Sequence, residues 1–358
     1  MMEIDGSYGE GGGQVVRTAL TLSVLTGKPV CIEKIRAGRR KPGLAPQHLT
    51  TVRALAEICD AEVAGAKIGS TVVSFVPRSV PKAGSYAFDV SEAAGGGSAG
   101  SVTLILQALL LPLSFAREPS RLTLVGGTHV AWSPPFDFVS DVYLPTLQAM
   151  GIHAQCRLVA WGFYPVGGGR IGVEIEPAET LSPIVVPVRG EPERVRGRAV
   201  ACNLPSHIAV RMANRACGLL APLDVPCAVT TERARAKGPG AGIFLTVEYA
   251  HARAGFSALG ERGKPSEAVA EEACRGLVEH DETGAPITAQ LADQLLLPCA
   301  LARGRSEFRV SRVTPHLLTN AHVIGRFALP VRMDIRGDEG GAGEVIVEGA
   351  GFEAPTER

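Results

Sequence analysis

Apolar positions along the chain alternate between short β-like runs and longer stretches with helical spacing. At the start of the chain, this pattern predicts a strand over 1–5, helices over 14–26 and from Pro46 onward, and strands over 29–35, 59–63 and 72–76. Pro46 suits the first turn of its helix, because a proline there gives up no hydrogen bond. The first segment therefore has the order βαβαββ.

This order of elements returns later in the chain together with a glycine signature. Asp5 with Gly11–Gly13 recurs as Asp89 with Gly95–Gly97, and the aspartate and the glycines share one shift of 84 residues. The second copy is expected to contain helices over 100–115 and from Pro134 onward, and strands over 121–125, 150–154 and 171–175. A third copy, which lacks the glycines, is expected from helices over 287–301 and 315–327 and strands over 307–311, 330–335 and 344–348.

Between the second and third copies lies an excess of about a hundred residues, enough for an inserted domain. Its pattern predicts strands over 195–202 and 243–249 and helices over 206–220 and 266–278. We therefore expect an α/β (α+β) fold with a large domain of three βαβαββ units, formed by residues 1–182 and 282–358. Residues 183–281 are expected to form a smaller inserted α/β domain.

Composition narrows the class of protein. Its 36 basic and 36 acidic residues cancel, so the chain lacks the broad positive field of a protein that coats long nucleic acid, and contact with nucleic acid should be local. Eight scattered cysteines without zinc-ligand spacing favour reduced thiols. The longest apolar stretch, 102–115, is interrupted by polar residues and too short to span a bilayer, and the N-terminus does not resemble an export signal. A cytoplasmic protein without a membrane partner is expected.

The loop Gly9–Gln14 leads into the helix that carries Arg17. Glycines let backbone N–H groups approach an anion, the helix start adds positive potential, and Arg17 could bind phosphate with both arms. Glu10 would be a natural Mg²⁺ contact. The alternative, a plain strand-to-helix turn, stays open, because the loop matches neither the P-loop nor the dinucleotide signature.

Four cations stand close together in the loop before the helix at Pro46, namely Arg36, Arg39, Arg40 and Lys41. Their mutual repulsion would be relieved by an anionic ligand, and arginine suits phosphate oxygens. A solvated basic loop is the commoner meaning of such a run. We favour phosphate binding, because Arg17 and Glu10 belong to a neighbouring element of the same repeat.

A third candidate is the segment 314–320, where Thr314 can cap a helix and Pro315 can take its first position. His316 would then lie in the first turn, where the helix dipole disfavours the protonated ring and leaves a neutral nucleophile. An ordinary structural histidine is the alternative, so residue chemistry alone leaves His316 as one candidate among eight histidines. The sequence offers neither a Lys-x-Asp-Gly run nor a P-loop, which makes histidine the remaining route.

Together these segments resemble the RNA 3′-terminal phosphate cyclase family, in its catalytic branch that bears the histidine. The motifs that carry the resemblance lie at 5–6, 9–14, Arg17, 35–39, 41–44 and 316–320, and further matches lie at 126–128, 134–135, 162–169, 238–240, 259–265 and 292–295. The resemblance covers nearly the whole chain. It implies a large domain of three βαβαββ units related to enolpyruvate transferases, with a small inserted α/β domain.

The resemblance also implies a mechanism. His316 would attack the α-phosphate of ATP to form a histidyl-adenylate, AMP would pass to an RNA 3′-phosphate, and the neighbouring 2′-OH would displace AMP to leave a 2′,3′-cyclic phosphate. The implied residues are Arg17, Arg36, Arg39 and Gln47 for the phosphates, Pro134, Phe138, Asp293 and Gln294 for the adenosine, and Glu10 for Mg²⁺ or Mn²⁺.

Two departures and two alternatives remain. Gln290 stands where the family often has a tyrosine beside the nucleotide, and the segment His129–Trp132 also differs from the family pattern. One alternative is the non-catalytic branch of the family that serves ribosome assembly and has lost the histidine. The other is an enolpyruvyl transferase on the same repeat fold. The sequence makes no prediction of the oligomeric state.

Overall fold

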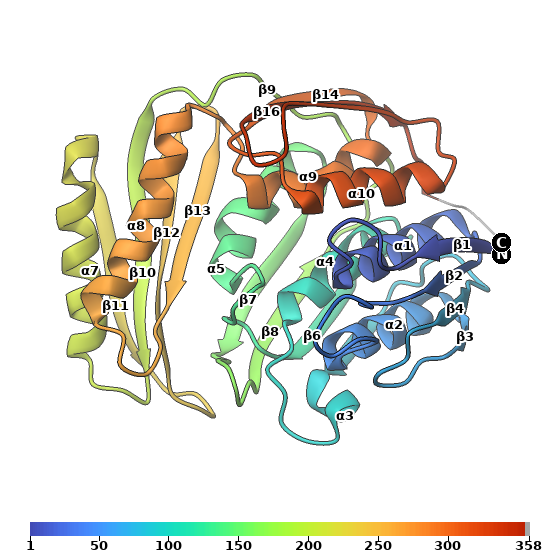
Figure 1. The fold of residues 1–358 in the computed structure, drawn as a ribbon, viewed down its shortest axis with the longest axis horizontal. Coiled ribbons are helices and arrows are strands. Elements are labelled where there is room, and N and C mark those ends of the chain that lie inside the picture. The colour runs from blue at the N-terminus through green and yellow to red at the C-terminus, as the bar shows by residue number, and fades with distance from the viewer. Residues whose placement is uncertain (355–358) are drawn as a thin grey trace.

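The three predicted repeats form three separate four-stranded sheets in the computed structural model, which describes residues 1–354 (Figure 1). A fourth four-stranded sheet belongs to the inserted segment. In each repeat, two helices connect the first strands and the last two strands close the sheet. The predicted α/β architecture of three βαβαββ units with an inserted unit is therefore confirmed.

The first unit follows the predicted order. Its elements are β1 (Met2–Asp5), α1 (Gly13–Thr26), β2 (Val30–Glu33), α2 (Pro46–Cys59), β3 (Glu62–Ala64) and β4 (Val73–Val76). The strands lie in the order β1-β2-β4-β3, with β1 and β2 parallel and the other pairs antiparallel. Helix α1 packs against α2, α4 and α10, so nearly all of its residues from Val15 to Leu25 are buried.

The second unit keeps the plan but adds short helical pieces. Its elements are β5 (Ser85–Asp89), α3 (Val90–Ala94), α4 (Val102–Ser114), β6 (Ser120–Gly126), α5 (Phe136–Phe138), the π-helical turn η1 (Val139–Tyr143), α6 (Leu144–Ala149), β7 (Ala154–Ala160) and β8 (Gly169–Ile175). Three details differ from expectation. The strand expected over 150–154 runs instead over Ala154–Ala160, because Met150 and Gly151 form the turn after α6. The short helix α3 stands between Asp89 and the glycines, and the helix expected to open at Pro134 begins at Phe136. The Pro134 carbonyl instead accepts a hydrogen bond of 2.7 Å from the Thr103 hydroxyl.

The third unit is split by the insertion. Its elements are β9 (Val185–Val186), α9 (Ala289–Leu301), β14 (Arg303–Val310), α10 (Pro315–Arg326), β15 (Arg332–Arg336) and β16 (Gly343–Ala350). Strand β9 pairs in parallel with β14 and completes the sheet order β15-β16-β14-β9. The boundary expected at 183 therefore moves past Val186, because the free edge of β14 is covered by a strand that precedes the insertion.

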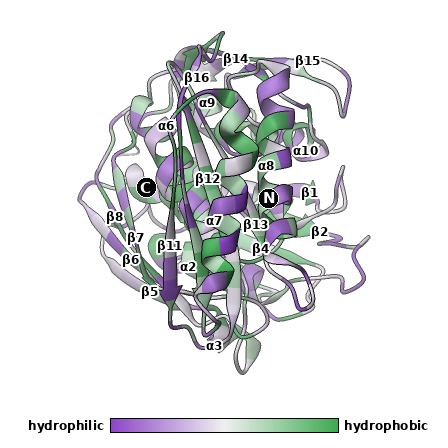
Figure 2. Ribbon diagram, turned by 90° about the vertical axis from the view of Figure 1, so that its left-hand side faces the viewer, coloured by the Kyte–Doolittle hydropathy of each residue, from purple (hydrophilic) through white to green (hydrophobic). Residues whose placement is uncertain are grey.

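The inserted unit is a sheet with two helices. Its elements are β10 (Pro192–Cys202), α7 (His207–Leu220), the 3₁₀ turn η2 (Ala221–Leu223), β11 (Cys227–Ala234), β12 (Gly240–Tyr249), β13 (Arg253–Leu259) and α8 (Ser266–Thr283). Helix α8 thus runs past the boundary expected at 282. The strands lie in the order β11-β10-β12-β13, and α7 and α8 pack side by side on the sheet (Figure 1). Figure 2 shows hydrophilic and hydrophobic segments alternating along both helices, as expected for helices with one buried face.

Three hydrophobic clusters lie within residues 1–354. The largest joins all three repeats around α1, α4 and α9, and a second lies between the sheet of the inserted unit and α7 and α8. A small third cluster joins Trp161 and Phe163 of the second unit to Val200, Cys202 and Phe244 of the inserted unit. Helix α4 is apolar on every side, because neighbouring elements enclose it. Within residues 1–354, no helix combines the length and apolar character that a membrane span requires.

Candidate active site

A cleft of about 710 Å³ opens between the repeats and the inserted unit. Its walls come from the loop before α1, the starts of α2 and α10, helix α9, strand β13 and helix α8. The cleft is lined by every site residue predicted from the sequence: Glu10, Arg17, Arg36, Arg39, Gln47, Pro134, Phe138, Asp293, Gln294 and His316. Segments from both ends of the chain thus meet in one place.

His316 lies in the first turn of α10, as its capping signal predicted. The Thr314 hydroxyl accepts a hydrogen bond of 2.9 Å from the Leu317 N–H, and Pro315 takes the first position of the helix. Burial lowers the pKa of His316, the charge of Glu10 opposes this shift, and the cations Arg17 and Arg39 add to it. The net lowering keeps the imidazole neutral at pH 7, the form in which a ring nitrogen can act as a nucleophile.

Glu10 fixes which ring nitrogen is available. Its Oε2 lies 2.7 Å from Nδ1 of His316, and its Oε1 pairs with the Arg39 guanidinium. The approach to Nδ1 is out of line for a good hydrogen bond. Because a carboxylate only accepts, this contact favours the tautomer with the proton on Nδ1 and the lone pair on Nε2. The Glu10 N–H also lies 3.4 Å from the Thr319 hydroxyl, so the glycine loop is tied to α10.

The basic loop contributes two of its four cations to the cleft. Arg36 and Arg39 line it, whereas Arg40 and Lys41 are exposed and do not line it. The Arg36 side chain donates a 2.8 Å hydrogen bond to the carbonyl of Gly43, so its guanidinium is already oriented. Gly43 has φ +79°, and a Cβ there would lie 2.2 Å from the Gly69 carbonyl oxygen. Only glycine therefore allows this tight loop.

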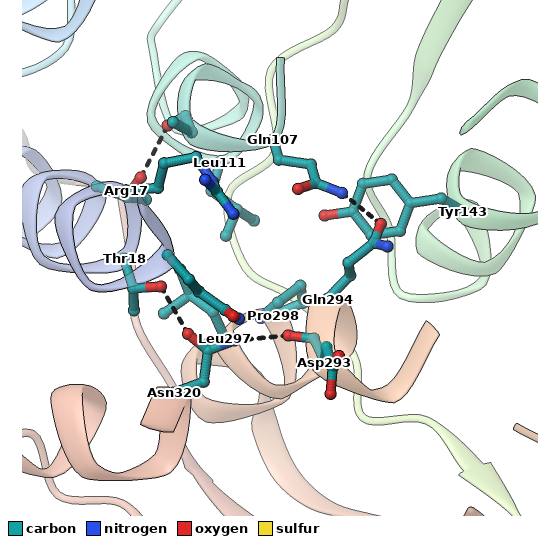
Figure 3. A pocket seen from close by; sticks show the side chains of 13 residues that line it. Arg17, Thr18, Gln107, Leu111, Tyr143, Asp293, Gln294, Leu297, Pro298 and Asn320 are labelled. Carbon is teal, nitrogen blue, oxygen red and sulfur yellow. Dashed lines mark hydrogen bonds between the residues drawn. The ribbon is translucent and has the colours of Figure 1, made fainter. Parts of the chain in front are cut away.

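The inner end of the cleft narrows to a small cavity of about 50 Å³, into which the Arg17 guanidinium points (Figure 3). Burial lowers the pKa of Arg17 to about 10, with the charge of Glu10 opposing the shift, so the side chain remains cationic at pH 7. Within residues 1–354, no carboxylate forms an ion pair with it. A half-buried cation without a carboxylate partner favours an anion at this end of the cleft.

Asp293 and its neighbours form the floor of this inner end (Figure 3). The Asn320 amide donates a 2.7 Å hydrogen bond to the Asp293 carbonyl and accepts one of 2.7 Å from the Thr18 hydroxyl. Burial raises the pKa of Asp293 to about 7; the hydrogen bond from Thr314 opposes this rise, and the charge of Glu10 adds to it. The side-chain oxygen of Gln294 accepts a hydrogen bond from Gln107. These contacts hold α1, α4, α9 and α10 together at the site.

Gln47 and His48 stand at the start of α2, and sequence analysis singled out only Gln47. Its Oε1 accepts a 2.8 Å hydrogen bond from the Ser101 N–H and so joins the starts of α2 and α4. Nδ1 of His48 accepts a 3.1 Å hydrogen bond from the Ala45 N–H, which places its proton on Nε2, beside Gly13. Burial, with the charges of Arg17 and Arg36, lowers the pKa of His48 to about 3. The ring is therefore a neutral donor at the cleft.

The opposite wall combines the second unit with the inserted one. Phe138 and Pro134 face residues of β13, and a Cβ on Gly255 would lie 3.0 Å from the Phe138 ring. Further lining residues that sequence analysis missed are Phe256, Ser257, Glu272, Ala273 and Gly276. No motif marks them, because they reach the cleft only through the packing of the inserted unit.

A buried polar network fixes this wall from behind. The Asp137 carboxylate lies 2.7 Å from Nε2 of His129 and accepts bonds of 3.0 and 2.6 Å from Arg198 of β10. The Arg198 guanidinium lies 4.7 Å above the Trp161 ring. Burial alone would raise the pKa of Asp137, but His129 and Arg198 hold it below its usual range. The network therefore connects the second unit to the inserted unit, directly beside Phe138.

Glu10 is the carboxylate that lies between His316 and Arg39 at the phosphate end of the cleft. Residues 1–354 contain no cluster of three or more His, Cys, Asp or Glu side chains that could hold a metal ion by themselves. A single carboxylate fits a hard cation that takes most of its ligands from phosphates and water, as Mg²⁺ does.

Comparisons with known proteins give a consistent result. A family model described as RNA 3′-terminal phosphate cyclase matches residues 8–335. A protein of that name from Methylococcus capsulatus is 51% identical over 350 residues, which cover 98% of this chain and 97% of the relative. Relatives of the same name from Trichormus variabilis and Methanopyrus kandleri are 53% identical over 329 residues (92% and 94% covered) and 44% identical over 358 residues (98% and 99% covered).

One similar solved structure is the enolpyruvyl transferase NikO from Streptomyces tendae. It shares 12% identity with this chain at a TM-score of 0.38, with 99% of this chain and 49% of that chain covered. This likeness is too weak to establish a common fold.

We expect Arg198→Met to lower the free energy of unfolding by about 2–4 kcal/mol, because it leaves the buried Asp137 carboxylate without its cation. Arg211→Met is the matched control, since Arg211 belongs to the same unit but forms an exposed ion pair with Glu267. That change should cost less than about 0.5 kcal/mol. Urea unfolding measures both, and equal losses would contradict the role of the network.

Asp293 predicts a dependence of stability on pH. Because its pKa is raised to about 7, the folded chain holds a proton that the unfolded chain has lost, so stability falls as the pH rises from about 5 to 8. Asp293→Asn does not titrate, and its stability relative to the parent chain should improve by about 2 kcal/mol over this range. Asp5→Asn is the control, because its pKa of about 2 lies outside the range. A constant difference for Asp293→Asn in pH-dependent urea unfolding would contradict the raised pKa.

Proposed function

The chain belongs to the RNA 3′-terminal phosphate cyclase family, and we propose that it converts RNA 3′-phosphates into 2′,3′-cyclic phosphates with the consumption of ATP. The observation that carries this proposal is the position of His316. Its ring is neutral, its Nε2 lone pair is free, and it shares a cleft with the cations Arg17, Arg36 and Arg39. This arrangement suits a nucleophile that attacks a phosphate.

In the first step, Nε2 of His316 attacks the α-phosphorus of ATP. An N–P bond forms, the bond from the α-phosphorus to the bridging oxygen breaks, and pyrophosphate leaves with the electron pair. The Nδ1 proton beside Glu10 stays in place, and the Glu10 carboxylate stabilises the positive charge that develops on the ring. The product is a histidyl-adenylate.

Two transfers follow. An oxygen of the RNA 3′-phosphate attacks the adenylate phosphorus, the N–P bond breaks, and His316 is regenerated with its lone pair on Nε2. The 2′-OH of the terminal ribose then attacks the 3′-phosphorus, and the anhydride bond to AMP breaks. AMP leaves with the electron pair, and its phosphate takes up the proton of the 2′-OH. The RNA keeps a 2′,3′-cyclic phosphate, and the sum of the steps releases pyrophosphate and AMP.

The remaining cleft residues would hold the substrates. Phosphate oxygens would be bound by Arg17, Arg36, Arg39 and the amide of Gln47. Three of these side chains supply donors that no carboxylate occupies, and the fourth, Arg39, is oriented by Glu10. Pro134 and Phe138 would pack against the adenosine. Asp293 and Gln294 would contact its polar edge, on the α9 side of the cleft.

A divalent cation, Mg²⁺ or Mn²⁺, would be held by Glu10. When bound, it would neutralise charge on the phosphates of ATP. Glu10 has two oxygens that face different partners, Arg39 and His316, so the same side chain orders the phosphate site and the nucleophile. We propose the cytoplasm as the compartment, because the eight cysteines are free thiols, as is usual in a reducing compartment.

Neither alternative fits the site as well. The non-catalytic branch of the family has lost the histidine. In this chain His316 is present, in the first turn of α10 and in contact with Glu10. An enolpyruvyl transferase would bind phosphorylated substrates with arginines but would have no use for a neutral histidine at the phosphate end. Labelling with α-³²P ATP separates the two enzymes, because only a cyclase becomes covalently tagged.

We expect His316→Ala to abolish the covalent label that forms with α-³²P ATP and Mg²⁺. The label on the parent chain should be acid-labile and alkali-stable, because an N–P bond to imidazole breaks once the ring nitrogen is protonated. His322→Ala is the control, since His322 lies on the same helix but stacks on Tyr8 outside the cleft. A full label on His316→Ala, mapped to a lysine, would falsify the mechanism.

Arg39→Ala should slow cyclisation by an amount equal to about 2–4 kcal/mol of transition-state stabilisation, because an oriented donor to phosphoryl charge is lost. Arg36→Ala should behave alike. Arg40→Ala, an exposed neighbour that does not line the cleft, should keep normal activity. The comparison uses kcat/KM on 3′-phosphorylated RNA together with thermal unfolding. Full activity of Arg39→Ala would mean that the loop is merely solvated.

A further inference from the structure

The side chain of Trp132 is the most exposed large hydrophobic group in residues 1–354. It is 100% exposed, yet it belongs to the lining of the catalytic cleft. Its backbone has φ +63°, a left-handed conformation that is unfavourable for a bulky residue. Such strain persists only where the surroundings enforce it, and it gathers at functional sites.

The backbone of the turn around Trp132 is restrained by its neighbours. The Ser133 hydroxyl donates a 3.1 Å hydrogen bond to the Val130 carbonyl across the turn. Pro134 and Pro135 follow directly and fix the backbone on the far side. On the near side, the His129 ring is buried in the network with Asp137. The ring of Trp132 is thus presented to solvent on a rigid support rather than on a loose loop.

We propose that Trp132 is a stacking platform for a nucleobase near the 3′ end of the RNA substrate. This inference rests on the proposed function, because it needs a single-stranded RNA end at the cleft. Unpaired bases stack on aromatic side chains, which gives affinity without a large basic surface. The chain has no net charge and directs few cations to the cleft, so a contact that does not depend on charge is needed to hold the RNA.

The position of Trp132 favours the RNA base over the adenine of ATP. Phe138, which would pack against the adenosine, is only 7% exposed and lies beneath the wall shared with the inserted unit. Trp132 lines the same cleft but is fully exposed. A substrate whose terminal phosphate reaches His316 extends outward from the cleft, so its bases would come within reach of an exposed ring at the opening.

The chain offers a direct spectroscopic test, because Trp132 and Trp161 are its two tryptophans. Trp161 is 5% exposed and packed against Phe163 and Phe244, so iodide should quench the fluorescence of Trp132 selectively. We expect a short 3′-phosphorylated RNA to shift this fluorescence and to protect Trp132 from iodide. Unchanged quenching at saturating RNA would overturn the proposal.

Variants supply the second arm of the test. Trp132→Ala should weaken RNA binding and raise the RNA KM about 5- to 150-fold, the range measured for loss of one stacked base. Trp132→Phe should keep most of the affinity, whereas Trp132→Leu should not. Tyr164→Ala is the control, because Tyr164 is 77% exposed but does not line the cleft, and it should bind RNA normally. Equal losses in both alanine variants would overturn the assignment to Trp132.

Self-adenylylation with ATP alone separates the possible failures. If Trp132→Ala raises the ATP concentration needed for the label as strongly as it raises the RNA KM, the ring stacks on adenine and the proposal is wrong. If the parent chain is active and Trp132→Ala binds RNA normally, the proposal also fails, but the proposed function stands. If the parent chain itself neither becomes labelled nor forms a cyclic phosphate, the proposed function fails first.

Discussion

The whole site depends on one buried carboxylate that two units share. Asp137 belongs to the second repeat, and its charge is matched by Arg198 of the inserted unit and by the hydrogen bond to His129. A buried carboxylate is stable only while both partners stay in place, so the pair fixes how the inserted unit docks. That docking creates the cleft, because one wall of the cleft is β13 and α8. The chemistry at the phosphate side of the cleft therefore depends on the packing behind its opposite wall.

A second carboxylate does the corresponding work inside the cleft. Glu10 comes from the first repeat, and it contacts both the third repeat, through His316, and the basic loop, through Arg39. The units could be predicted from the repeated sequence pattern. In the folded chain they converge, and each unit contributes residues to the same site. Burial lowers the pKa of His316 and raises that of Asp293, so it favours the neutral form of both side chains.

Sequence analysis succeeded where a signal is local or repeated. The glycine triplets that begin at Gly11 and Gly95 indicated the repeated units. Thr314 with Pro315 indicated the start of the helix that carries His316. The grouping of the ligand residues came from family resemblance. Strand β9 was missed because a run of two residues has no periodicity. These residues form a strand only through their pairing with β14. His48 and the Asp137–Arg198 contact were missed for the same reason, since long-range packing defines them.

The distance along the chain between Glu10 and His316 affects how the protein is made. A ribosome completes the first two units long before it adds α10, and early units begin to fold as they emerge. The first two units share their hydrophobic core with the third and do not contain His316, so under the proposed mechanism a prematurely terminated product cannot form the adenylate. Covalent attachment of AMP therefore requires a full-length chain in which all three units have folded together. The fraction of chains that accept AMP would measure the yield of correct synthesis and folding.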